Sequence, residues 1–136
     1  MMKILQPPGW ATPKGYANGI AAKGGTTVFV AGQIAFDSQN IIRETTFGGQ
    51  FRQTLKNTLA VLAEAGAKPE HIVRMTWYIT DKREYLGALK EVGAAWRELM
   101  GRYYPVMAVV QVGALIEDAA KVEIETTAVV PDGSAS

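Results

Sequence analysis

Two segments of this 136-residue chain repeat apolar residues at a helical period, with runs of β-branched residues between and around them. The segments are residues 47–65 and 82–100, and Phe51, Leu55 and Leu62 mark the period in the first. An amphipathic helix must bury its apolar stripe against another layer. The pattern therefore predicts helices packed on a sheet.

The strand predictions rest on short runs rich in Val, Ile, Thr and aromatic residues. These runs are residues 16–22, 26–34, 71–80, 106–115 and 121–130, and a further short strand is expected at the start of the chain. Gly24 and Gly25 form a hairpin signal between the first two runs. The predicted order is ββ-α-β-α-ββ. This order defines an α+β fold in which two helices cover one face of a mixed sheet.

The first long strand has two largely apolar faces. Strict alternation places Val28, Val30 and Gly32 on one face and Phe29 and Ala31 on the other. We expect both faces to be covered, although the two helices cover only one. A second copy of the chain is the simplest cover for the other face, so the pattern favours a homo-oligomer.

The chain is expected to form a single domain over residues 1–136, with a small polar tail, residues 131–136, that frays. Its 14 basic and 13 acidic residues give a formal net charge of +1 and form no basic stripe. This balance favours neither nucleic acid nor a membrane surface as partner. No signal peptide or membrane span is evident, so we expect a cytoplasmic protein.

Residue types that are scarce exclude several chemistries. The chain has no cysteine, and its only histidine is His71, which is expected in an exposed loop. The serines are Ser38, Ser134 and Ser136, in a predicted loop and in the tail. A Ser–His–Asp triad and a zinc site are therefore not expected. We expect no cofactor and no metal.

Carboxylates remain as candidates for acid–base chemistry. Glu123 and Glu125 alternate with Val122 and Ile124, so both acidic side chains point to one face of a strand. One interpretation is a solvated strand face. The other is a carboxylate held in a partly buried cleft and used for proton transfer.

Several segments, in order and at matching spacing, resemble the reactive-intermediate deaminase (Rid/YjgF) family. They are VAGQI at 30–34, the helix residues at 50–57, LAEAG at 62–66, the strand at 72–81 and the closing strand at 122–128. The resemblance spans nearly the whole chain.

The resemblance implies a chorismate-mutase-like α+β fold. It also implies a homotrimer whose sheets face inward around a central barrel, with small-molecule clefts between subunits. Active members of the family hydrolyse enamine and imine intermediates, typically 2-aminoacrylate, and release ammonia.

Some of the family's cleft residues are matched here. The cleft tyrosine corresponds to Tyr16, and the glycine and glutamine of the Ser-Gly-Gln motif correspond to Gly32 and Gln33. The glutamate associated with the attacking water corresponds to Glu123. The resemblance therefore implies that Glu123 is the catalytic residue and that the other three bind substrate.

The remaining cleft positions have lost their polar groups. The serine position is Ala31, the helix asparagine position is Leu89, and the Pro-x-Arg-Ser segment ends here in Met107 and Ala108. Met107 thus replaces the arginine that grips the substrate carboxylate. The implied cleft is more apolar than in family members that act on 2-aminoacrylate.

Two functions fit these departures. The first is a hydrolase with a larger substrate, such as an aminomuconate-like enamine, held by another cation: Arg102, Arg74 or Lys14. The second is a trimeric module that binds a small molecule without turnover. Ribonuclease activity, reported for some relatives, is not supported by the near-neutral charge.

Overall fold

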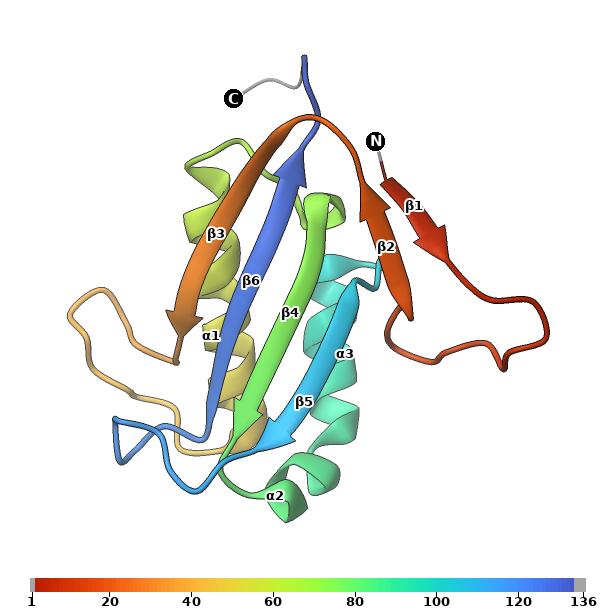
Figure 1. Ribbon diagram of the computed structural model, residues 1–136. Coiled ribbons are helices and arrows are strands. Elements are labelled where there is room, and N and C mark those ends of the chain that lie inside the picture. The colour runs from red at the N-terminus through yellow and green to blue at the C-terminus, as the bar shows by residue number, and fades with distance from the viewer. Residues whose placement is uncertain (1, 134–136) are drawn as a thin grey trace.

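The computed structural model describes residues 2–133, and its centre is a four-stranded mixed sheet (Figure 1). The strand order is β3 (Thr26–Gln33), β6 (Val122–Val130), β4 (Ile72–Ile79) and β5 (Val106–Gln111). β4 and β5 run parallel, while β6 is antiparallel to both β3 and β4. The α+β class predicted from sequence is confirmed. Residues 134–136 of the predicted frayed tail lie outside the described residues.

The helices lie on one face of this sheet, as predicted (Figure 1). The first is α1 (Phe47–Ala63). The prediction of one helix over 82–100 is wrong, because α2 (Lys82–Gly87) ends before α3 (Leu89–Met100) begins. Ala88 separates them with φ −110° and ψ 11°, outside the helical region. The break places Leu89 at the first position of α3.

The N-terminal strands stand apart from the main sheet. β1 (Met2–Leu5) and β2 (Gly19–Ala22) pair only with each other. The hairpin predicted at Gly24 and Gly25 is therefore wrong, because β3 pairs with β6 instead of β2. Both glycines have positive φ, and a Cβ on Gly25 would lie 2.3 Å from the Val130 carbonyl oxygen. The turn thus lies tightly against the end of β6.

The core lies between the sheet and the helices. Phe51 and Leu55 of α1 are fully buried against inward-facing strand residues such as Trp77 and Ile124. The expectation that both faces of the first strand are covered is wrong within one chain, since Phe29 is 77% exposed. The face of the sheet away from the helices is uncovered.

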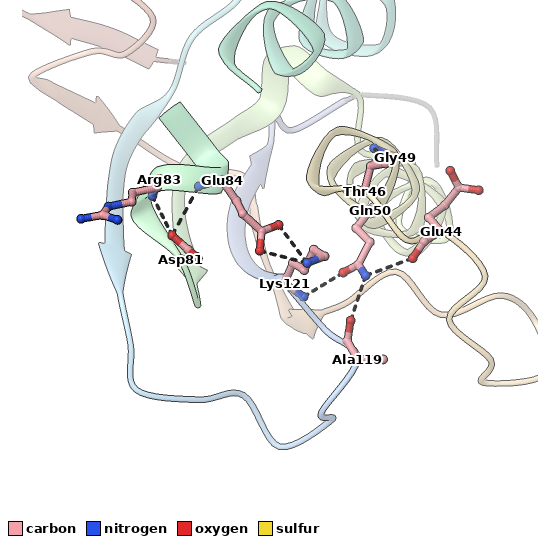
Figure 2. A network of polar contacts seen from close by, with 9 residues as sticks. All are labelled: Glu44, Thr46, Gly49, Gln50, Asp81, Arg83, Glu84, Ala119 and Lys121. Carbon is pink, nitrogen blue, oxygen red and sulfur yellow. Dashed lines mark hydrogen bonds and ion pairs between the residues drawn. The ribbon is translucent and has the colours of Figure 1, made fainter. Parts of the chain in front are cut away.

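A buried amide ties α1 to the segment that leads into β6 (Figure 2). Gln50 is 1% exposed, and its Nε2 donates to the carbonyl oxygens of Glu44 at 3.0 Å and Ala119 at 2.8 Å. Its Oε1 accepts the Lys121 N–H at 2.8 Å. The Lys121 ammonium in turn pairs with Glu84 at 2.8 Å. These bonds hold Lys121, the residue immediately before β6 and two residues before Glu123.

A second amide on α1 holds the segment that follows β3. Asn57 Nδ2 donates to the carbonyl oxygens of Ile34 at 3.0 Å and Phe36 at 2.8 Å. Its Oδ1 accepts a hydrogen bond from Gln53. The polar residues of α1 therefore anchor the ends of two adjacent strands, β3 and β6.

We predict that Gln50→Leu lowers the free energy of unfolding by about 3 kcal/mol, because it leaves an N–H and two carbonyls without their partner in a buried site. Gln53→Leu is the matched control, since Gln53 is half-buried and its side chain bonds only Asn57. Urea unfolding at fixed protein concentration measures both. Equal costs for the two variants would contradict the role assigned to Gln50.

Candidate functional site

Three predicted site residues line one pocket of about 410 Å³ between β5 and α3. They are Tyr16, Leu89 and Met107. Met107 lies on β5 opposite Met75 of β4, on the helix side of the sheet. The volume is within the range of small-molecule sites.

A bend before β2 brings Tyr16 to this pocket. Gly15 takes a positive φ of 80°, and the next peptide group is fixed to the start of β5. The Ala17 N–H donates to the Pro105 carbonyl oxygen at 2.9 Å, and Ala17 bridges to Val106. Ala17 and Pro105 are almost ninety positions apart in sequence, so a long-range contact places Tyr16 at the pocket.

Aromatic side chains form much of the pocket wall. Trp96 and Tyr104 are stacked, with ring centroids 5.7 Å apart and an interplanar angle of 4°. Trp77 packs on Trp96 at 5.9 Å and edge-on to Tyr85 at 6.4 Å. Trp77 and Trp96 are buried core residues, and the same rings line the pocket.

The polar atoms of this wall are hydrogen-bond donors. Burial raises the pKa of the Tyr85 hydroxyl, so it stays protonated at neutral pH. Trp96 Nε1 donates to the Tyr103 carbonyl at 3.1 Å. Trp77 Nε1 is buried, and no partner for it lies within residues 2–133.

Two cations complete the pocket lining. Lys14 is one of the three candidates considered from sequence, and Arg97 is one that sequence reasoning missed. Of the other candidates, Arg74 lines a hollow on the uncovered sheet face, and Arg102 lines neither that hollow nor this pocket. Within the part of the chain described, neither Lys14 nor Arg97 forms an ion pair.

Glu123 lies directly over Gly32. A Cβ on Gly32 would stand 2.6 Å from Glu123 Oε2 and 2.7 Å from its Cδ. The pairing of β3 with β6 shifts between Val30 and Gln33, so strict alternation breaks down there. The prediction that Gly32 shares a face with Val30 is therefore wrong. Gln33 Nε2 bonds locally to the Ala31 carbonyl at 3.2 Å.

Ala31 and Ala108 lie on the uncovered face of the sheet, in a broad hollow of about 870 Å³. Tyr78 and Glu125 line the same hollow, and the Tyr78 hydroxyl donates to Glu125 Oε1 at 2.6 Å. This hydrogen bond, with smaller contributions from burial and nearby carboxylates, raises the pKa of Tyr78. Tyr78 is therefore a protonated donor at neutral pH.

The predicted site residues thus fall into separate groups within one chain. Tyr16, Leu89 and Met107 line the pocket on the helix side. Glu123 lines a different hollow, of about 300 Å³, beside the exposed Ile116. The carboxylate and the pocket do not form one cavity in the isolated chain.

Other candidate chemistry is limited among the described residues. His71 is half-buried rather than fully exposed, and its Nδ1 accepts the Lys68 N–H at 2.9 Å in the turn η1 (Pro69–His71). Residues 2–133 contain no cluster of three or more His, Asp or Glu side chains placed to hold a metal ion. No helix in that range is long and apolar enough to cross a bilayer.

Comparison with known proteins identifies the family. Residues 10–130 match the family model described as Endoribonuclease L-PSP. A RutC family protein of Synechocystis is 36% identical over 138 residues, covering 96% of this chain and 98% of the relative. The chain belongs to the Rid/YjgF family.

Further Rid/YjgF relatives match over similar lengths. TdcF of Escherichia coli, which carries the name of a reactive intermediate deaminase, is 33% identical over 95% of this chain and 98% of its own length. The crystal structure of TdcF with bound serine superposes with a TM-score of 0.66 at 31% identity, covering 94% and 98% of the two chains. YyfB of Yersinia pestis, a Rid protein of unknown function, superposes with a TM-score of 0.84 at 24% identity, covering 95% and 98%. YyfB therefore supports the fold alone.

The approach of Glu123 to Gly32 predicts a coupling between these positions. Gly32→Ala should lower the free energy of unfolding by about 0.5–1.5 kcal/mol, because the new methyl group forces the flexible end of the Glu123 side chain out of its present rotamer. In a Glu123→Ala background the same change should cost much less, since the overlapping atoms are gone. A double-mutant cycle by urea unfolding at fixed protein concentration measures the difference. Equal costs in both backgrounds would contradict this geometry.

Proposed function

We propose that this Rid/YjgF protein is a hydrolase that releases ammonia from an enamine or imine substrate other than 2-aminoacrylate. The proposed site lies between subunits of a homotrimer. It combines the pocket of Tyr16, Leu89 and Met107 with Glu123 of a neighbouring subunit. The observation that carries the proposal is the Glu123 carboxylate lying over Gly32 on the uncovered face of the sheet.

The carboxylate is suited to the proton transfers that the reaction needs. An enamine first becomes its imine, when a carbon gains a proton and the nitrogen loses one. Water adds to the carbon of the C=N bond, and Glu123 accepts the proton that the water loses. Glu123 then returns a proton to the nitrogen, and the carbinolamine collapses to a carbonyl compound and ammonia. The substrate and one water thus account for all atoms of the products, and no redox partner is required.

The uncovered sheet face supports the proposed assembly. Phe29 is 77% exposed and Val110 is 42% exposed on that face. Exposed apolar residues gathered on one sheet face are typical of an interface. A neighbouring subunit placed there would shield Glu123 from bulk water and bring a second set of pocket residues towards it.

The apolar replacements support a substrate different from 2-aminoacrylate. Met107, Leu89 and Ala31 stand where the family's carboxylate-gripping and polar cleft residues are found. A small carboxylate gains little from the weakly accepting sulfur of methionine. A larger conjugated enamine, such as 2-aminomuconate, can use the apolar wall.

The same replacements favour a second candidate, a trimeric binding module without turnover. In that case Glu123 serves as a hydrogen-bond acceptor for a ligand in the same clefts. The two functions differ in one observable, which is the release of ammonia.

Ammonia release from freshly generated 2-aminomuconate and 2-aminoacrylate tests the proposal. We expect release from 2-aminomuconate and much less from 2-aminoacrylate. Glu123→Gln should lower the rate at least a hundredfold, because a positioned general acid–base typically contributes about 10²–10⁴. Glu125→Gln is the matched control, since Glu125 lies two residues along the same strand face.

The possible outcomes separate the two candidates. Absence of release from both substrates would exclude the hydrolase and leave the binding module. If Glu123→Gln released ammonia as fast as the unaltered protein, Glu123 would have no part in the mechanism.

A further inference from the structure

The pocket between β5 and α3 has an apolar floor and a positively charged mouth. Its floor includes the buried residues Trp77, Val92 and Trp96, which are 3–6% exposed. Lys14 and Arg97, by contrast, are exposed. Among residues 2–133 no carboxylate lines the pocket, although the chain carries 13 acidic residues. This separation of charge from apolar wall predicts a ligand with an apolar body and an anionic end.

The Arg97 side chain lies over a position of α3 that carries no side chain. Gly93, one turn earlier, lines the same pocket and has no side chain to occupy the wall. A Cβ on Gly93 would lie 3.3 Å from Arg97 Nη1, so the guanidinium folds back along the helix over this glycine. Within the described chain Arg97 is not neutralised by an ion pair. A planar guanidinium matches a carboxylate through two parallel hydrogen bonds, and Arg97 has its donors free for such a ligand within the described residues.

The aromatic wall selects the body of the ligand. The stacked pair Trp96–Tyr104 and the tilted pair Trp77–Trp96 present ring faces and edges within one pocket. Aromatic contacts of this kind favour a flat conjugated partner over a flexible aliphatic chain of the same area. A volume of about 410 Å³ accommodates one ring with a short side chain.

We infer that this pocket binds a planar aromatic or conjugated carboxylate, with its flat body against the aromatic wall and its carboxylate held by Arg97 and Lys14. The inference rests on the proposed function only in taking this pocket as the ligand cleft, and it does not depend on turnover. In this inference Arg97 and Lys14, which lie outside the family's cleft motifs, bind the ligand carboxylate. They take the place of the family's arginine, which is Met107 here.

Calorimetric titration with three probes tests the inference. Cinnamate has both the flat body and the carboxylate, cinnamamide lacks the charge, and acrylate lacks the ring. We expect cinnamate to bind at least tenfold more tightly than either of the others. A tenfold difference is the lower end of what one charge-assisted hydrogen bond contributes.

Variants assign the charge to its residues. Arg97→Gln and Lys14→Gln should each weaken cinnamate binding about tenfold and weaken cinnamamide binding much less, because the amide carries no charge. Lys90→Gln is the control, because Lys90 is an exposed cation of α3 outside the pocket lining. It should bind all three probes as the unaltered protein does. All three changes are on exposed side chains, and thermal unfolding verifies that the fold is kept.

The outcomes distinguish this inference from the proposed function. The inference would be overturned if cinnamate did not bind, or if cinnamate and cinnamamide bound with equal affinity. It would also be overturned if neither Arg97→Gln nor Lys14→Gln weakened cinnamate binding. Cinnamate binding with the expected preferences, but no ammonia release from any enamine, would uphold the inference and exclude the hydrolase. Ammonia release without cinnamate binding would uphold the hydrolase and overturn the inference.

Discussion

The arrangement of this protein depends on one buried amide, Gln50. Its side chain bonds two carbonyls and one N–H, and these groups belong to the segments that precede α1 and β6. β6 is an inner strand of the sheet, paired with β3 on one side and β4 on the other. A strand in that position sets the register of both neighbours, and a one-residue slip would turn each side chain to the other face. The amide on α1 therefore acts together with the buried Val122 and Ile124 to fix which face of β6 carries Glu123.

The same register explains why the candidate site is divided. Glu123 faces away from the helices, over the bulge at Gly32, whereas Met107 faces the helices from β5. A single sheet cannot bring both side chains to one ligand, because they project from opposite faces. In the proposed trimer, Glu123 and Met107 at one ligand come from different subunits. The division thus links the exposed apolar face of the sheet to the chemistry proposed for the protein.

Much of the fold could be predicted from the sequence, because the period of α1 and the alternation of β4 and β6 are local patterns. The errors arose where the backbone departs from a local pattern. The break at Ala88 follows Gly87, but the apolar period continues across it and so predicted one helix, and Gly24–Gly25 turns the chain without pairing β2 to β3. In the candidate site, Tyr16, Leu89 and Met107 line one pocket, and their role in substrate binding stays a prediction. The place of Arg97 in the pocket lining could not be predicted, since it depends on how α3 packs beside β5.

The central claim is that the functional site is completed only between subunits. Sedimentation equilibrium at micromolar protein concentration tests this most directly, because it reports the mass of the assembly without any assumption about the ligand. The account predicts a single species with three times the mass of the chain. A species with the mass of one chain would contradict it, since Glu123 and the aromatic pocket would then remain in separate hollows.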